Sequence, residues 1–256
     1  MINLTLDLGS RFVKIAVQQG DTVTFTRKDT INFYKHNIDR TDDGKIAVNL
    51  DFLGVDTQSA TILTTGYGRN LLQFSNTTAI SEIKAHFHGA KSQTKEDNFT
   101  LVDIGGQDSK VIQVTDGYIN DFTMNDKCAA STGRFIEQAA NILDIPLSEF
   151  MECAESPVAL SDTCAVFCES ELIGKLAGGA TDRSLAAGVN LSVARRLAPA
   201  IDRYSPTKIY ASGGAAQSSA LLHFLSELTT VNVEPLPDTQ YNGVIGLLAY
   251  INLQGL

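Results

Sequence analysis

The feature that most constrains the fold of this chain is a short pattern that occurs twice. An alternating apolar run, typical of a β-strand, ends at Asp7 in the first copy and at Asp103 in the second. A glycine turn follows each aspartate, and a lysine stands seven residues after it, at Lys14 and at Lys110. A further apolar run and a Gly/Asp pair come next, which predicts a strand, a turn and another strand. Two such copies in one chain predict two similar α/β halves.

An Asp-x-Gly turn at the end of a strand suits a bound phosphate. Glycine lets the backbone approach a ligand closely, and exposed N–H groups in such a turn attract anions. We therefore expect Gly9, Ser10, Gly105 and Gly106 to contact phosphate, with Lys14 as a further candidate. The alternative, that Asp-x-Gly merely ends a strand, is the usual explanation for a single copy, and the matched second copy favours phosphate.

A third glycine turn occurs late in the sequence. Residues 207–212 form an apolar run that ends in Gly213-Gly214, and residues 215–227 have helical spacing. A strand, a glycine pair and a helix bring the backbone close to an adenosine or its phosphates. We expect Gly213, Gly214, Ala215 and Gln217 to border adenosine, although a glycine pair alone ends many strands.

Length and composition limit the possible functions. With 256 residues the chain has room for two domains. We expect an N-terminal lobe over residues 1–95 with the first phosphate turn, and a C-terminal lobe over residues 96–256 with the second turn, the cysteines and the adenosine motif. The last helix, from Asn242, could pack back on the first lobe.

The net charge of −9 argues against nucleic acid as a partner, because phosphate backbones are bound by clustered Lys and Arg. No apolar run approaches the ~20 residues of a membrane-spanning helix, and the first residues do not resemble a secretion signal. These features predict a cytoplasmic protein with no membrane partner.

The four cysteines are grouped within 41 residues of the second half, at Cys128, Cys153, Cys164 and Cys168. In a cytoplasmic protein such a group favours metal binding or redox chemistry over disulfides. Cys128 and Cys164 both stand near predicted helix starts, where a thiolate is favoured. Two thiolates make half of an iron–sulfur site, which two identical chains would complete across a two-fold axis. Buried structural thiols are the alternative.

The remaining elements follow from hydrophobic spacing. Strands are expected at residues 2–8, 13–18, 22–27 and 60–65, and helices at 47–55, around 81–86, from 135 and over 185–203. Residues 91–98 lack apolar side chains and read as a surface linker.

Motifs along the whole chain resemble those of one family, the ATP-dependent activators of 2-hydroxyacyl-CoA dehydratases, iron–sulfur proteins called archerases. The wider family includes the ATPase subunits of benzoyl-CoA reductase. The matching stretches, in family order, are Asp7 to Ser10, Thr65 to Asn70, Asp103 to Asp108, Met124 to Phe135, Thr163 to Phe167 with Glu169 to Glu171, Ser212 to Gln217, and Gln240 to Gly243.

The resemblance implies the two-lobed α/β fold shared by acetate and sugar kinases, heat-shock chaperone ATPases and actin, with ATP and Mg²⁺ between the lobes. It also implies a homodimer with one [4Fe–4S] cluster at its axis, held by the residues that match the family ligands, Cys128 and Cys164 of each chain. ATP hydrolysis would then drive one electron, drawn from ferredoxin or flavodoxin, into a partner iron–sulfur reductase or dehydratase.

Within that resemblance, Asp7 and Asp103 are expected to organise Mg²⁺ and the attacking water, and Gln107 to orient the water. One departure is Ser131, which stands where the family usually has glycine. A serine at helical or β angles is unstrained, so we expect no loss of function. The other departure is Cys168, for which two interpretations are open. It is either a buried core residue or a swapped or additional cluster ligand.

Two functions from other classes remain open from the sequence. A small-molecule kinase of the same fold would use one aspartate, with Asp103 as the candidate, to deprotonate a hydroxyl. A nucleotide-gated binding or chaperone-like module would contain no iron.

Overall fold

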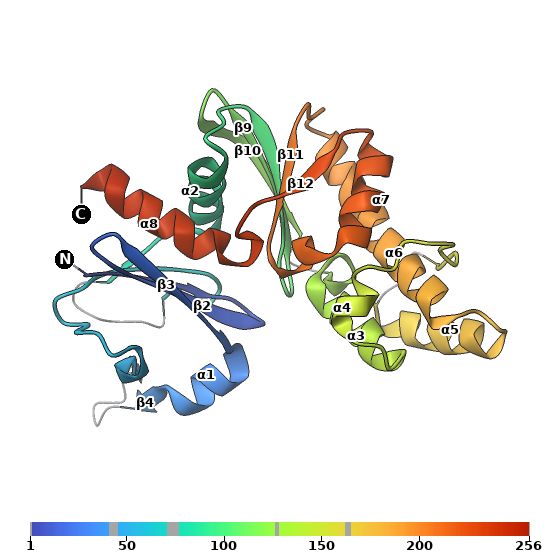
Figure 1. Cartoon of the computed structure of the whole chain (residues 1–256), viewed down its shortest axis with the longest axis horizontal. Helices are drawn as coiled ribbons and strands as arrows, with labels where there is room; N and C mark the ends of the chain where they lie inside the picture. The colour runs from blue at the N-terminus through green and yellow to red at the C-terminus, as the bar shows by residue number, and fades with distance from the viewer. Residues whose placement is uncertain (1, 41–45, 71–76, 126–127, 162–164, 256) are drawn as a thin grey trace. The chain divides into compact units, whose positions relative to one another are not determined.

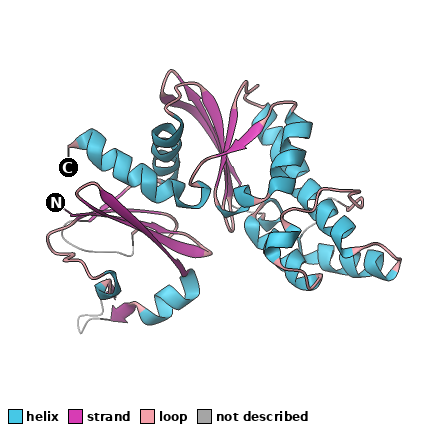
Figure 2. Cartoon of the chain, in the orientation of Figure 1, coloured by secondary structure: helices cyan, strands magenta, loops and turns pink. Residues whose placement is uncertain are grey.

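The computed structural model describes residues 2–40, 46–70, 77–125, 128–161 and 165–255, and the chain divides into two compact units (Figure 1). The first unit comprises Met1–Lys95 and Tyr241–Leu256, and the second comprises Glu96–Gln240. Each unit combines a mixed β-sheet with helices (Figure 2).

The first unit is built on a five-stranded sheet with the order β3-β2-β1-β6-β7. Its strands are β1 (Ile2–Leu8), β2 (Phe12–Gln19), β3 (Thr22–Asp29), β6 (Thr61–Thr65) and β7 (Thr77–Ala79). The first three form an antiparallel meander, and β6 and β7 continue the sheet in parallel with β1.

Both faces of this sheet are covered, which is why β1 is buried along nearly its whole length. Alternate residues Leu4, Leu6 and Leu8 pack into one core with Phe33 of α1 (Thr30–His36). The opposite face packs on α2 (Glu82–Thr94) and the final helix α8 (Asn242–Gln254). The same alternation turns Thr5 toward α8, where its hydroxyl donates to the Val244 carbonyl at 3.1 Å.

The second unit repeats this plan in a sheet with the order β10-β9-β8-β11-β12. Its strands are β8 (Phe99–Ile104), β9 (Ser109–Thr115), β10 (Tyr118–Asn125), β11 (Ile209–Ser212) and β12 (Val233–Pro235). Again three strands form an antiparallel meander, and β11 and β12 run parallel to β8. The common topology confirms the predicted duplication.

Helices pack on the second sheet to form the largest hydrophobic core in the described residues. They are α3 (Gly133–Ile142), α4 (Leu147–Phe150), α5 (Ala165–Ala177), α6 (Asp182–Asp202) and α7 (Ser219–Thr229). Short 3₁₀ turns η2 (Ala129–Ser131), η3 (Gly214–Gln217) and η4 (Thr239–Tyr241) precede α3, α7 and α8.

The helix predicted over residues 47–55 is wrong. This region contains β5 (Ile46–Val48), which pairs with β4 (Ile38–Arg40), and then the 3₁₀ turn η1 (Asp51–Leu53). Asn49 explains the break, because its side-chain oxygen accepts the Asp51 N–H at 2.9 Å and its backbone pairs with Asn37.

Candidate functional site

The first phosphate turn joins β1 to β2. Asp7 is buried, and its carboxylate accepts a hydrogen bond from the Lys14 ammonium at 2.9 Å. The two residues face each other across the antiparallel pair, so the seven-residue spacing in the sequence places them in register. Gly9 and Ser10 form the turn, and the Gly9 carbonyl accepts the Thr30 hydroxyl at 2.8 Å.

The second phosphate turn joins β8 to β9 and repeats the cross-strand pair, now between Asp103 and Lys110. Here the lysine is fully enclosed, with 2% of its side chain exposed. Its ammonium lies 2.7 Å from the Asp108 carboxylate and 3.5 Å from the Asp103 carboxylate. The turn is closed by the Gly105 N–H, which donates to the Asp108 carbonyl at 2.9 Å. Gln107 is exposed at the tip.

The third turn follows β11 and contacts the second directly. The Ser212 hydroxyl donates to the Asp103 carboxylate at 2.7 Å. Gly213 has a φ of +90°, and a Cβ there would lie 2.3 Å from the Ile104 carbonyl oxygen, so only glycine is accommodated. Gln217 lines a surface cavity of about 500 Å³ together with Ala216, Leu222 and Thr239, whereas Ala215 is buried.

The residues predicted to bind nucleotide therefore form two groups, one in each unit. Asp103, Gly105, Gly106, Gln107 and the third turn are brought together in the second unit. Asp7, Gly9, Ser10 and Lys14 are brought together in the first.

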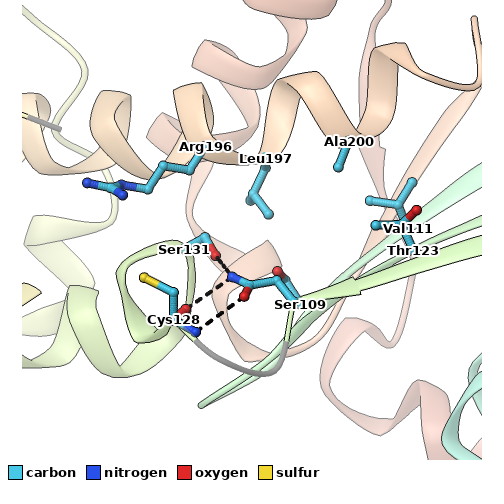
Figure 3. Close-up of a pocket in the computed structure, with 9 residues that line it drawn as sticks. Ser109, Val111, Thr123, Cys128, Ser131, Arg196, Leu197 and Ala200 are labelled. Atoms are coloured by element: carbon cyan, nitrogen blue, oxygen red, sulfur yellow. Dashed lines mark hydrogen bonds between the residues drawn. The ribbon is translucent and has the colours of Figure 1, made fainter. Parts of the chain in front are cut away.

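Cys128 is exposed at the start of η2, where the backbone is extended. Its backbone is held by the Asn125 side chain, whose oxygen accepts the Cys128 N–H at 3.3 Å and whose amide donates to the Cys128 carbonyl at 3.1 Å. Figure 3 shows Cys128 and Ser131 on one side of a cavity of about 180 Å³, with Arg196 and Leu197 of α6 opposite. The predicted helix start is therefore a 3₁₀ turn, and α3 begins at Gly133.

Cys164 lies outside the described residues, and α5 begins at the next residue, Ala165. No group of three or more His, Cys, Asp or Glu side chains able to hold a metal ion occurs in the described part of the chain.

Cys153 and Cys168 are core residues, with 2% and 5% of their surfaces exposed. The Cys153 thiol donates to the Glu149 carbonyl at 3.2 Å, and burial raises its pKa. Burial, aided by the nearby Glu171 carboxylate, raises the pKa of Cys168 to about 11. Cys168 is thus held as a neutral thiol at physiological pH.

The raised pKa of Cys168 predicts a specific loss of stability in alkali. Between its ordinary pKa of 9.0 and its folded value of about 11, the unfolded chain releases the Cys168 proton and the folded chain retains it. The Cys168 contribution is therefore constant below pH 9 and decreases as the pH rises to about 11. We expect the free energy of unfolding of the wild type, relative to Cys168→Ala, to fall by roughly 2 kcal/mol over this range. Urea titrations at several pH values measure this difference, and a pH-independent difference would contradict it.

Ser131 is unstrained, as expected, because it lies in η2 and its φ is not in the left-handed region. Its buried hydroxyl accepts a hydrogen bond from the Asn125 amide at 2.6 Å. The serine therefore adds a contact that a glycine there could not make.

Several contacts of the site were not predicted from the sequence. The repeat identified Lys110 and Asp103, but it did not predict that the Lys110 ammonium also pairs with the Asp108 carboxylate. Ser212 and Asn125 lie within stretches that match the family, but their roles were not predictable, because the partner of Ser212 is distant in the sequence and the bonds of Asn125 depend on the conformation of its loop.

None of the helices described is long and apolar enough to cross a membrane.

Similar proteins were found by sequence and by structure. The chain is 41% identical over 192 residues to the (R)-2-hydroxyglutaryl-CoA dehydratase activating ATPase of Acidaminococcus fermentans, covering 73% of this chain and 74% of that protein. It is 38% identical over 192 residues to the activator of lactoyl-CoA dehydratase of Anaerotignum propionicum, covering 73% of each.

The solved structure of the activator of the 2-hydroxyisocaproyl-CoA dehydratase from Clostridium difficile, with bound ADPNP, superposes with a TM-score of 0.83 at 26% identity. It covers 100% of this chain and 98% of that one. This similarity confirms the predicted two-lobed α/β fold of the actin-like ATPases. Residues 35–250 match the BadF/BadG/BcrA/BcrD ATPase family, and the chain belongs to that family.

Proposed function

We propose that this protein is a reductive activase, in which ATP hydrolysis drives an electron from a [4Fe–4S] cluster shared by two copies of the chain into a partner iron–sulfur reductase or dehydratase. The observation that carries the proposal is the exposed Cys128, held beside the second phosphate turn. The names of the relatives, activators of 2-hydroxyacyl-CoA dehydratases, indicate the class of partner.

The aspartates and the phosphate turns perform the hydrolysis. Asp7 and Asp103 would hold Mg²⁺, which would help to position the attacking water, and the exposed Gln107 would orient that water. Gly9, Ser10, Gly105 and Gly106 contact phosphate, with Lys14 as a further cation. The ion pair between Lys14 and Asp7 supports this role, because it holds the ammonium at the first turn.

The third turn receives the adenosine. Gly213 and Gly214 allow the backbone to approach it, and Gln217 reaches it from the cavity of about 500 Å³. Ala215 is buried and contributes by packing under the turn rather than by presenting a polar group.

Cys128 and Cys164 of two chains hold the cluster. An exposed thiol fits a ligand shared between two copies, because a cluster needs four cysteines, and Cys153 and Cys168 of each chain are buried in the core. The cluster, when bound, supplies one electron at a time. Ferredoxin or flavodoxin would be the electron donor, and nucleotide would shift the protein between two states only to the extent that it binds them with different affinities.

The first experiment asks whether the protein transfers the terminal phosphoryl group of ATP to water or to the hydroxyl of a substrate. In ¹⁸O-labelled water, ATP should be cleaved without any added acceptor, and the released phosphate should carry one ¹⁸O from water. A protein that forms ADP only when a sugar or hydroxy acid is added, with the phosphate found on that hydroxyl, would be a small-molecule kinase of the same fold.

A further inference from the structure

We propose that Gly133 is the residue through which the second phosphate turn positions Cys128, so that a change in the turn on nucleotide binding reaches the cysteine through the backbone. This inference rests on the proposed function and names the connection that the function requires. It concerns the Cys128 segment, by which we mean Asn125 and residues 128–134.

The carboxyl end of the Cys128 segment is bonded to the turn itself. The Gly133 N–H donates to the Gly105 carbonyl at 2.9 Å, and the Arg134 N–H donates to the Gly106 carbonyl at 3.0 Å. These are the first two N–H groups of α3, which ordinarily need a cap. Thr132, the N-cap residue, makes no side-chain capping bond. The phosphate turn therefore caps the helix.

Close packing reinforces these bonds. A Cβ on Gly133 would lie 3.3 Å from the Gly105 oxygen and 3.8 Å from both the Gly106 Cα and the Ala215 Cβ. Gly133 thus lies against the second phosphate turn and also reaches the third. A displacement of the turn must either carry the start of α3 with it or break both bonds.

Hydrogen bonds also link Thr132, which precedes Gly133, to Ala129, which follows Cys128. The Thr132 hydroxyl donates to the Ala129 carbonyl at 2.6 Å, and the Thr132 N–H donates to the same oxygen at 3.0 Å. Ala129 follows Cys128 directly. This part of the segment has little freedom to absorb a displacement of Gly133.

The amino end of the segment is attached to the same hairpin. Asn125, the last residue of β10, faces Ser109, the residue after Asp108. The Asn125 side chain bonds both backbone groups of Cys128 and the Ser131 hydroxyl. Both ends of the Cys128 segment therefore begin on the hairpin that carries the phosphate turn.

A matched pair of substitutions distinguishes loss of the Gly133–Gly105 hydrogen bond from a general disturbance of the fold. Gly133→Pro removes the N–H that donates to Gly105, at the first helical position where proline is favoured. The preceding Thr132 is already extended (φ −135°, ψ 166°), as a residue before proline prefers. Gly133→Ala keeps the N–H and is the control, with a side chain that requires the Gly105 oxygen to shift by a few tenths of an ångström.

The readout is the labelling rate of the Cys128 thiol with iodoacetamide, measured by peptide mass spectrometry on the full chain freed of iron, with and without ADPNP. We expect ADPNP to change this rate by about fivefold or more in the wild type and in Gly133→Ala. In Gly133→Pro we expect a change below about twofold, although ADPNP still binds.

A Gly133→Pro protein whose Cys128 responds to ADPNP like the wild type would overturn the proposal. Hydrogen exchange on the wild type keeps the proposal testable if the proline variant does not fold. The amides of Gly133 and Arg134 should change protection when ADPNP binds, and unchanged protection would also overturn it. Iron content, measured separately, decides the proposed function, so a chain that binds iron without this response would refute only the connection.

Discussion

Asp103→Asn is expected to lower the ATP turnover number by at least about 10²-fold while the iron content of the protein stays unchanged. The Asp103 carboxylate is buried at the end of β8, where it accepts the Ser212 hydroxyl and lies 3.5 Å from the Lys110 ammonium. An asparagine keeps the shape and one hydrogen bond acceptor but removes the charge that is to hold Mg²⁺. Because Cys128 is held by Asn125 rather than by Asp103, the cluster ligands should be unaffected.

Asp116→Asn is the matched control, since Asp116 is exposed in the β9–β10 hairpin of the same unit. Its φ of 52° is one that asparagine tolerates. Phosphate release and iron are measured on the same preparations. If Asp103→Asn lost iron as well as ATP turnover, this would contradict the assignment of ATP hydrolysis and cluster binding to separate residues.

Lys110→Met should lower the free energy of unfolding of the second unit by about 3–5 kcal/mol. The lysine is 2% exposed and lies within 3.5 Å of two carboxylates. Methionine fills a similar volume but leaves Asp103 and Asp108 facing each other without this cation. An uncompensated charge in a buried site is costly, and here the two carboxylates also repel each other.

Lys14→Met provides the comparison, because the repeat places Lys14 in the same register with Asp7. The Lys14 side chain is 18% exposed and, among the described residues, is paired with one carboxylate rather than two, so its removal leaves no pair of repelling carboxylates and the expected loss is smaller, about 1–3 kcal/mol. Urea unfolding followed by hydrogen exchange resolves the two units. Equal losses in the two variants would show that burial of Lys110 is not what makes its pair important.

The sequence predicted the sheet strands well because their patterns are local. The expected strand at residues 2–8 is β1, and those at 13–18, 22–27 and 60–65 correspond to β2, β3 and β6. Alternation of apolar residues marks each of them. The Asp–Gly–Lys repeat was informative for the same reason, since the hairpin that pairs Asp103 with Lys110 is formed by neighbouring segments.

Features that depend on tertiary contacts were not predictable in this way. The helix expected over residues 47–55 is replaced by a strand and a 3₁₀ turn, because Asn49 bonds to Asn37 and to Asp51. The short turn η2 between Cys128 and α3 depends on Asn125 and on the Gly105 and Gly106 carbonyls. Hydrophobic spacing marked the buried face of α3 but carried no information about these bonds.

Iron and acid-labile sulfide, measured per two chains in protein purified without oxygen, test the central claim most directly. We predict about four irons per two chains. Cys128→Ser and Cys164→Ser should each abolish the iron and the visible absorbance, whereas Cys168→Ser, which alters a buried core thiol, should retain both. An iron-free wild-type protein that hydrolyses ATP normally, or a protein that loses its iron only in Cys168→Ser, would contradict the claim.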